Sequence, residues 1–509
     1  MATSTIGSRM GAGLAAAAVS LGLTQLAASF FSAAADARTA VGTSVINLTP
    51  GPVKEWAIQT FGTADKLFLT VMVVVVVLAL CAIAAIWERS RVPVGSLVIA
   101  AAGAAGALAV LAQPGARALD VIPTLLGAVC GIATIRLLTG GRRLTAGRLP
   151  EQTADTERRR SLLTLGLVAA GALSGVAGHV LTRQRRSVAG DRQTFALPTA
   201  ATPAPTVPPE VQPAAQGLTS FITNNADFYR IDTALSVPQL SRADWRLRIH
   251  GMVDREITYT FDDLAEFEPI EKAVTLACVS NPVGGELISN AVWTGYRVRD
   301  LLARSGVRPD ADMVLSTSVD GFNVGTPVEA LTDDRDAMLA IGMNGVPLPV
   351  EHGYPARLVV PGLYGFVSAT KWVVDLELTR FDRAEAYWTK LGWSAQAPIK
   401  TQSRIDVPRT GTRLAAGPVT VGGVAWAQHR GVKAVEVRID DGPWQPATLG
   451  AAYSADTWRL WTYGWQATPG SHTLTVRATD NTGAVQTEQA APPAPDGATG
   501  WPTVSVQVK

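Results

Sequence analysis

Five long apolar stretches in the first 185 residues constrain the fold of this chain more than any other feature. They run over about 11–33, 66–87, 93–113, 118–138 and 161–181. A helix needs about 20 apolar residues to cross the hydrocarbon core of a bilayer, so each stretch is long enough, or nearly so, to span it. The third and fourth are separated by a short turn, QPGAR, and predict a helical hairpin. Residues 1–182 are therefore predicted to form a membrane domain of about five transmembrane helices.

Basic residues between the apolar stretches predict their orientation. Arg89 and Arg91 lie between the second and third stretches, and six arginines within 142–160 lie between the fourth and fifth. Cytoplasmic loops are enriched in lysine and arginine, so the N-terminus is predicted inside and everything after about residue 182 outside. The arginines within 183–186 weigh mildly against this orientation, and residues 9–35 would also fit a signal peptide. We expect a multi-pass protein of the plasma membrane with an extracytoplasmic C-terminal part.

An arginine-rich motif precedes the fifth stretch. Residues 157–163 read ERRRSLL, which resembles the twin-arginine export motif. Plain positive-inside anchoring by Arg158, Arg159 and Arg160 is the open alternative. The export interpretation gains force only if the exported domain must fold around a cofactor before it crosses the membrane.

The rest of the chain divides into three segments. Residues 183–216 are rich in proline, alanine and threonine and predict a linker. Residues 217–395 mix strand-like and helical runs, which predicts an α+β domain. Residues 398–509 alternate polar and apolar positions between glycine-containing turns, which predicts an all-β sandwich. The 44 Lys+Arg and 42 Asp+Glu nearly balance, so no charge field indicates nucleic acid as a partner.

The cysteines and histidines limit the redox chemistry of the chain. Cys81 and Cys130 lie inside apolar stretches, and Cys278 is alone in the outer portion, so no disulfide framework is expected there. A lone cysteine in that position is a packed apolar residue, a free thiol or a ligand. None of the five histidines forms a pair within the apolar stretches, and the chain has no iron–sulfur cysteine motif. Electrons would therefore pass to or from a separate one-electron redox partner.

Three segments in a fixed order carry the strongest indication of function. A strand-like run ends in TLAC at Cys278, and WTGY and RDLL follow from Trp293 onward. Upstream, residues 225–230 read NADFYR, and downstream, residues 352–362 read HGYPARLVVPG. Together these segments resemble the sulfite oxidase family of molybdopterin-dependent oxidoreductases. The resemblance covers about 217–509, and the membrane part resembles no family that we can name.

The resemblance implies a molybdenum–molybdopterin cofactor and a set of site residues. Cys278 would be the thiolate ligand of the metal, because a soft, charged sulfur suits molybdenum, and Arg230 would hold an anionic substrate oxygen. The cofactor-binding residues would be Asn225, Phe228, Tyr229, Arg230, Thr317, His352, Arg357, Ser368, Thr370 and Lys371. Thr317 rests only on its distance from Cys278. Which of Ser368, Ala369 and Thr370 faces the cofactor phosphate is left open.

The same resemblance implies a function and an assembly. The expected reaction is two-electron oxo transfer on a small substrate such as sulfite or a sulfoxide, and the C-terminal segment would be an immunoglobulin-like dimerisation domain that forms a homodimer. Asp232 and Trp393 stand where the animal enzymes of the family have a histidine and a tyrosine, which puts the substrate in doubt. The alternative is a non-catalytic, membrane-tethered binding protein that uses its β-sandwich. That alternative leaves the segments around Cys278 and His352 unexplained.

Overall fold

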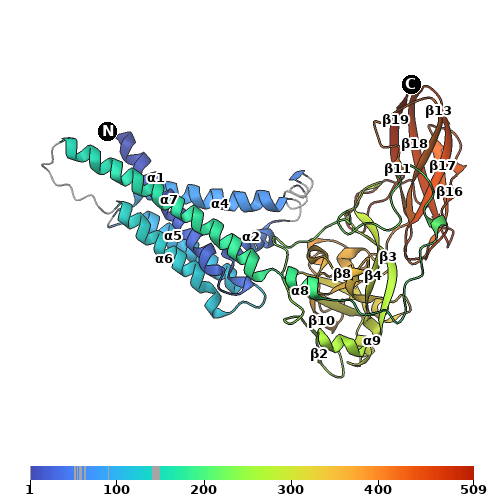
Figure 1. The fold of residues 1–509 in the computed structure, drawn as a ribbon, viewed down its shortest axis with the longest axis horizontal. Coiled ribbons are helices and arrows are strands. Elements are labelled where there is room, and N and C mark those ends of the chain that lie inside the picture. The colour runs from blue at the N-terminus through green and yellow to red at the C-terminus, as the bar shows by residue number, and fades with distance from the viewer. Residues whose placement is uncertain are drawn as a thin grey trace. The chain divides into compact units, whose positions relative to one another are not determined.

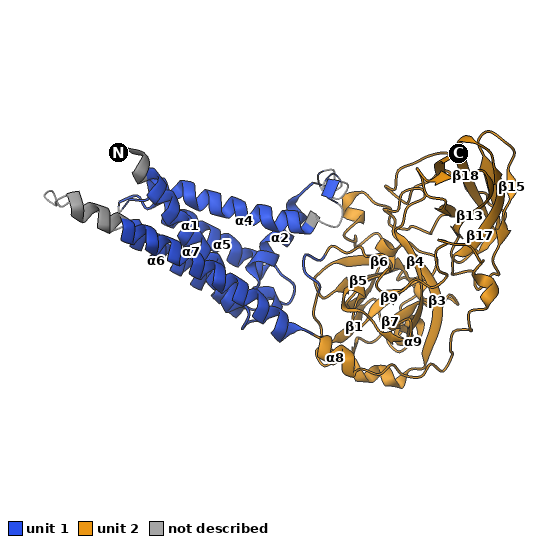
Figure 2. Cartoon of the chain, turned by 45° about the horizontal axis from the view of Figure 1, so that its top comes forward, with its two compact units in different colours: residues 1–187, 234–237 blue, residues 188–233, 238–509 orange. Residues whose placement is uncertain are grey.

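The computed structural model describes residues 2–50, 53, 56, 60, 61, 65–89, 91–139 and 150–509. The chain divides into two compact units, which Figure 2 colours separately. Unit 1 comprises residues 1–187 and 234–237, and unit 2 comprises 188–233 and 238–509. Arg142, Arg143 and Arg148, on which the predicted orientation partly depends, lie outside the described residues.

Unit 1 is built from helices. Among its described residues, the α-helices are α1 (Ala2–Ala28), α2 (Ala37–Leu48), α4 (Asp65–Ala84), α5 (Val94–Leu111), α6 (Ile122–Thr139) and α7 (Pro150–Arg186) (Figure 1). Among the described residues, five segments are long and apolar enough to cross a membrane, over 6–28, 66–87, 94–111, 118–139 and 158–194. The first lies nearer the N-terminus than the predicted 11–33, because the chain turns after Ala28 and Asp36 caps α2 through the Arg38 N–H.

Small residues determine how closely these helices pack. A Cβ atom added to Gly22 of α1 would collide with the backbone of Gly171 in α7, and one added to Gly178 would collide with Gln25 and Leu26. Glycine at such positions lets two helix backbones approach without intervening side chains. The contact therefore joins the first long helix of unit 1 to the last.

A buried carboxylate lies in the same bundle. Glu88 is 5% exposed and accepts hydrogen bonds from the Ser96 N–H at 3.0 Å and the Ser96 hydroxyl at 2.7 Å. The Arg136 guanidinium donates to the same hydroxyl at 3.2 Å. This polar cluster joins the start of α5 to α6, because a buried carboxylate must be hydrogen-bonded where water is excluded.

The segment 183–216 is more ordered than its composition suggests. It contains the end of α7 and the short helix α8 (Ala189–Thr194), followed by extended chain. The Ala201 N–H donates to the Pro269 carbonyl at 2.8 Å, and Val211 is 1% exposed within the core of unit 2. The apolar residues between the prolines bury enough surface to hold this segment against unit 2, so it differs from the free linker that was expected.

The first part of unit 2 contains two five-stranded sheets. One has the order β2-β1-β10-β5-β6, with β1 parallel to β10 and the other pairs antiparallel. Its strands are β1 (Arg246–Gly251), β2 (Ile257–Thr260), β5 (Met313–Ser318), β6 (Asn323–Pro327) and β10 (Val373–Thr379). The other has the order β3-β4-β7-β8, and β9 pairs with β7. Its strands are β3 (Pro269–Ala277), β4 (Ile288–Arg297), β7 (Met338–Met343), β8 (Val346–Pro347) and β9 (Arg357–Val359).

Two short helices accompany these sheets, α9 (Val298–Ala303) and α10 (Val328–Thr332). Trp245 and Leu247 of the first sheet and Leu358 of the second are fully buried in one core cluster, and α9 contributes Leu301 to it. The combination of mixed sheets and helices is the α+β architecture predicted for this part of the chain.

The remaining strands form a structure that we call the C-terminal sandwich. Its sheets have the orders β11-β13-β17-β16 and β12-β19-β18-β14-β15. The strands are β11 (Gln402–Val407), β12 (Arg413–Leu414), β13 (Gly417–Trp426), β14 (Val432–Ile439), β15 (Gln445–Pro446), β16 (Thr448–Leu449), β17 (Arg459–Ala467), β18 (Gly470–Asp480) and β19 (Thr503–Val508). Trp461 of one sheet and Val437 and Val476 of the other share one buried core, as packed sheets require. The predicted all-β sandwich is confirmed.

Candidate functional site

Cys278 lies directly after β3, at the start of a ten-residue connection to β4. Its N–H donates to the Leu287 carbonyl at 2.9 Å, and its carbonyl accepts from the Asn281 N–H at 3.1 Å. The buried side chain of Asn281 in turn accepts from the Leu287 N–H at 2.9 Å. We call residues 278–287 the cysteine loop. These bonds close the loop at its base, so the position of the thiol is set by the end of β3.

The thiol of Cys278 is buried, and it lies beside hydrogen-bond donors and a cation that would stabilise a thiolate. Burial raises the pKa of Cys278, whereas the backbone N–H and hydroxyl of Ser280 and the charge of Lys371 lower it. Hydrogen-bond donors aimed at a sulfur stabilise a thiolate, and a coordinated metal removes the proton outright. Cys278 is thus a buried thiol whose neighbours would stabilise it as a thiolate.

Aromatic rings form one wall beside this loop. Phe228 is buried and packs edge-to-face against His352 and Trp293, with ring centroids 5.4 Å and 5.6 Å away. The ring of Tyr229 stacks on Phe228 at 5.4 Å, and the Tyr229 N–H donates to the Ser289 hydroxyl at 3.2 Å. Burial raises the pKa of Tyr229, and the nearby Cys278 raises it further, so its hydroxyl stays protonated.

Arg357 is a buried cation without a carboxylate partner. The residue is 3% exposed, and its guanidinium donates to the His352 carbonyl at 3.2 Å and lies 5.1 Å from the Trp293 ring centroid. Across the part of the chain that the structure describes, no carboxylate lies within ion-pair distance of it. Burial lowers the pKa of Arg357 to about 10, which still leaves it protonated. An isolated buried charge is costly, so such a group fits an external anion.

Lys371 is a second cation in the same region. Its ammonium group donates to the Glu351 carbonyl at 3.0 Å and lies 3.3 Å from an oxygen of Asp232. Burial lowers the pKa of Lys371 to about 8, while the charge of Asp232 raises it. The same Asp232 oxygen pairs with Arg230 at 2.9 Å, and 42% of the Arg230 side chain is exposed. Asp232 therefore joins a buried cation to one at the surface.

His352 has one ring nitrogen satisfied and one not. Nε2 lies 3.2 Å from the Asn225 carbonyl, which only accepts hydrogen bonds, so Nε2 carries the proton. Nδ1 is buried and has no hydrogen-bond partner in the structure. Burial, with Arg357 and Lys371 nearby, lowers the pKa of His352 to about 3, so the ring is neutral. A buried acceptor without a donor is rare in proteins and fits a ligand that supplies one.

Asn225, Ser368 and Thr370 have their polar groups engaged within the protein. The Asn225 side chain donates to the Met343 carbonyl at 3.2 Å and accepts from Asn344 at 2.7 Å. Ser368 donates to the Tyr364 carbonyl at 2.9 Å. These three residues hold the backbone around the site, and their side chains already have partners.

Thr317 stands apart from the other predicted residues. The Thr370 hydroxyl lies 2.6 Å from the hydroxyl of Ser316, the neighbour of Thr317 on β5. Successive side chains of a strand point to opposite faces, so Thr317 is directed away from Thr370. The structure thus brings Ser316 to this region and does not bring Thr317, because spacing from Cys278 cannot fix which side of a strand a residue occupies.

Several residues that contact the site are not among those predicted from the sequence. Ser280 contacts the thiol, Trp293 packs against Arg357, and Asp232 joins Arg230 to Lys371. A hydroxyl two residues after a candidate ligand is a signal that could have indicated Ser280 in advance. Asp232 was treated only as a departure from the family pattern, and the structure gives it two cationic partners.

Comparisons with known proteins identify relatives of this chain. The family model described as "Oxidoreductase molybdopterin binding domain" matches residues 234–388, and that of a "Bacterial Ig domain" matches 402–476. Human mitochondrial sulfite oxidase is 29% identical over 56% of this chain and 61% of its own length. An uncharacterized oxidoreductase of Bacillus subtilis is 31% identical over 29% of this chain and 72% of its own length. The sulfane dehydrogenase SoxCD of Paracoccus pantotrophus superposes with a TM-score of 0.50 and 26% identity, over 57% of this chain and 82% of that one.

The fold and the site thus define a molybdopterin-dependent oxidoreductase. More narrowly, the chain belongs to the sulfite oxidase family. The predictions of an enzyme and of a molybdopterin cofactor are confirmed, as is the predicted immunoglobulin-like character of the C-terminal sandwich. The chain spans only about 61% of the length of the human relative.

Proposed function

We propose that this protein catalyses two-electron oxo transfer on a small oxyanion or sulfur-containing substrate such as sulfite or a sulfoxide. The observation that carries the proposal is the juxtaposition of two features. One is the loop-held thiol of Cys278 with its Ser280 donors, and the other is the uncompensated buried charge of Arg357. A soft metal ligand together with a buried cation that has no carboxylate partner suits a phosphate-bearing molybdenum cofactor.

The chemistry of the side chains in the site suits the cofactor. Cys278 would bind the metal, and Arg357 and Lys371 would hold the phosphate. The free Nδ1 of His352 would accept a hydrogen bond from the pterin. When bound, the cofactor supplies a metal that changes its oxidation state by two electrons and exchanges an oxygen atom with the substrate. Phe228 and Tyr229 would exclude water from that centre.

Arg230 is proposed to hold the anionic oxygen of the substrate. It is the most exposed cation of the site, and Asp232 fixes its guanidinium at 2.9 Å. Electrons are proposed to enter or leave through a separate one-electron carrier, according to whether the substrate is reduced or oxidised. The sequence has three cysteines, fewer than the four that bind an iron–sulfur cluster, and two of them lie in the apolar stretches.

A replacement of the ligand tests the proposal directly. Cys278→Ser is expected to abolish turnover while the protein still folds, because a hydroxyl is nearly isosteric but a poor ligand for molybdenum. Anaerobically reduced and oxidised enzyme would be assayed with sulfite, sulfoxides and nitrate, with molybdenum content measured in parallel. Cys130→Ser, in α6, is the matched control and should retain wild-type turnover. Wild-type activity of Cys278→Ser would refute the assignment.

Unit 1 is proposed to anchor the enzyme in the plasma membrane, with unit 2 outside the cytoplasm. If all five apolar helices cross the membrane, α1 would begin on the side where Arg158 lies and α7 would end on the other. A domain that folds around a cofactor in the cytoplasm must cross the membrane already folded. We therefore propose that the twin-arginine motif directs its export. A homodimer through the C-terminal sandwich is proposed from the family resemblance.

Export is tested by replacing Arg158, Arg159 and Arg160 with lysine. The charge that sets topology is kept, whereas guanidinium recognition is lost. We expect a wild-type unit 2 to be digested by protease added to spheroplasts and that of the triple-lysine variant to be protected. Lysine at Arg183 and Arg185 serves as the control. Normal exposure of unit 2 in the triple variant, or protection of the wild type, would contradict the proposal.

A further inference from the structure

The strand that ends at Cys278 has one edge that its own sheet leaves open. β3 is the terminal strand of its sheet and pairs there with β4, and near its start Pro269 and Glu271 bond to the extended segment at Ala201 and Thr202. Main-chain groups on such an edge need partners from elsewhere when they are buried. Toward the end of β3, which leads to Cys278, the partners come from the C-terminal sandwich, which belongs to the same compact unit.

Thr275, three residues before Cys278, is held by the sandwich at each of its polar groups. Its N–H donates to the Asp456 carbonyl at 3.0 Å, and its carbonyl accepts from the Gln428 side chain at 3.1 Å. Its hydroxyl accepts from the Trp458 N–H at 2.8 Å. Thr275 is 1% exposed, so water cannot replace these partners.

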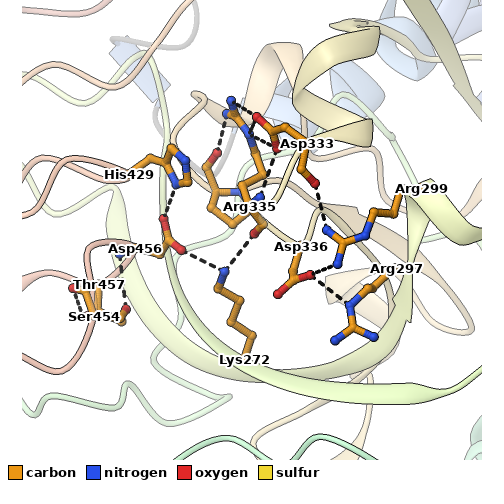
Figure 3. A network of polar contacts seen from close by, with 11 residues as sticks. Lys272, Arg297, Arg299, Asp333, Arg335, Asp336, His429, Ser454, Asp456 and Thr457 are labelled. Atoms are coloured by element: carbon orange, nitrogen blue, oxygen red, sulfur yellow. Dashed lines mark hydrogen bonds and ion pairs between the residues drawn. The ribbon is translucent and has the colours of Figure 1, made fainter.

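Charged side chains reinforce this contact, as Figure 3 shows. Lys272 of β3 reaches Asp456 at 3.0 Å, and His429 reaches the other oxygen of the same carboxylate at 3.0 Å. Lys272 also donates to the Arg335 carbonyl at 2.8 Å. The Asp456 side chain is only 7% exposed, so screening by solvent is weak. Asp456 thus ties the metal-ligand strand to a loop of the sandwich.

The far end of the cysteine loop has a separate attachment to the sandwich. Arg404 of β11 donates to the Gly285 carbonyl at 3.2 Å and to the Thr219 hydroxyl at 3.2 Å. The same guanidinium pairs with Asp406 at 2.6 Å. A cavity of about 710 Å³ lies along this side of the loop, lined in part by Glu286 and Arg404. The loop is therefore held there by hydrogen bonds more than by packing.

We propose that the C-terminal sandwich positions the metal ligand, by clamping β3 at Thr275 and the cysteine loop at Gly285. This inference rests on the proposed role of Cys278. Residues that orient a metal ligand through hydrogen bonds change metal affinity or activity by about 10–100-fold when they are replaced. Asp456, Gln428 and Arg404 are positioning residues in this sense, because they act on the ligand through the backbone.

Three variants of the full-length chain test the clamp. Asp456→Asn removes the charge that Lys272 and His429 share, Gln428→Met removes one donor to Thr275, and Arg404→Lys keeps a charge beside Asp406 but loses the forked donors. Matched controls come from the ion pair of Arg477 on β18 and Glu436 on β14, whose charged atoms are 2.8 Å apart. Both strands lie in a sheet of the sandwich to which β3 does not belong. The controls are Glu436→Gln and Arg477→Lys.

The first readout is hydrogen exchange of residues 272–287 in cofactor-free protein. We expect about tenfold faster exchange at Thr275 and Cys278 in the three variants and no change in the controls. In loaded protein we expect an altered Mo(V) resonance and about tenfold lower kcat per bound molybdenum, with KM nearly unchanged. Gln428→Met, the mildest change, keeps the test open if Asp456→Asn fails to fold.

Two outcomes separate the clamp from the role of Cys278. If the variants match their controls in exchange and in the Mo(V) signal, the clamp is wrong, whatever Cys278 does. If Cys278→Ser leaves the Mo(V) signal and turnover unchanged, the ligand assignment is wrong. Faster exchange in the three variants would then still show that the sandwich holds the cysteine loop. The proposal that this attachment positions a metal ligand would be overturned.

Discussion

Two buried arginines in unit 2 have opposite surroundings. Arg404, at the junction of the cysteine loop with the C-terminal sandwich, is paired with Asp406, and both side chains are at most 10% exposed. Arg357, in the cofactor site, is 3% exposed and donates to main-chain carbonyls alone among its described neighbours. For these two arginines, the charge whose partner is supplied by the chain serves the fold, and the charge left without a carboxylate partner suits a ligand. The rule does not cover Arg230 and Lys371, which share Asp232 and are assigned to ligands on other grounds.

The largest loss of stability is expected when Arg404, the arginine with a carboxylate partner, is replaced. Arg404→Met leaves Asp406 as a buried, unpaired carboxylate, which costs about 3–5 kcal/mol of unfolding free energy. Urea denaturation of cofactor-free protein would measure it. Replacement of both residues, Arg404→Met with Asp406→Leu, should recover most of the loss because no charge is then stranded. Equal destabilisation by the single and double variants would contradict this account.

The unpaired arginine should respond in the opposite way. Arg357→Met removes a buried charge that lacks a counterion, so the cofactor-free protein should be no less stable than wild type. Cofactor binding should weaken by about 1.5–3 kcal/mol, roughly tenfold to a hundredfold, through loss of charged hydrogen bonds. Molybdenum per chain after reconstitution and the urea midpoint would be compared. A stability loss as large as that of Arg404→Met would show that Arg357 serves the fold.

The smallest expected effect is on the pH dependence of stability, which should have opposite signs for His352 in the cofactor site and His472 in the C-terminal sandwich. Burial lowers the pKa of His352 to about 3, so its contribution to stability is present above the unfolded pKa of about 6.5 and is lost as pH falls from there toward 3. His352→Gln, which still offers a donor to Asn225, should flatten this acid-side slope in cofactor-free protein.

His472 provides the control for that measurement. The hydrogen bond to Asp440 raises the pKa of His472, so its contribution is present below the unfolded pKa and is lost as pH rises through the folded value. His472→Gln should therefore change the slope near neutral pH and leave the acid side as in wild type. Identical pH profiles for both variants would remove the proposed distinction.

Local sequence patterns predicted much of this molecule. The apolar stretches became long helices, the alternation after residue 398 became a sandwich, and the segments around Phe228, Cys278 and His352 meet in one site. These features depend on residues close together in the chain, where periodicity or a motif is sufficient. The ends of α1 were harder to place, because an alanine-rich run contains no charge that fixes where the helix stops.

Contacts between distant residues escaped prediction. Ser316 instead of Thr317 reaches Thr370 because strand register decides the side of a sheet, and spacing along the chain does not. The attachment of Thr275 to Asp456 joins two segments that were treated as separate domains. Proline and alanine in 183–216 indicated a linker, since composition does not reveal the docking surface that a neighbouring sheet provides.

The glycine-lined contact between α1 and α7 has a consequence for biosynthesis. These are the first and last long helices of unit 1, so α1 leaves the ribosome well before the partner that fits Gly22 exists. Until then α1 can pack on α4 and α6, but its face at Gly22 has no partner from α7. In the proposed membrane orientation, α7 arrives together with the domain that it tethers. Closure of the bundle would therefore mark a chain whose delivery across the membrane is complete, and a stalled chain would remain recognisable by the uncovered face of α1 at Gly22.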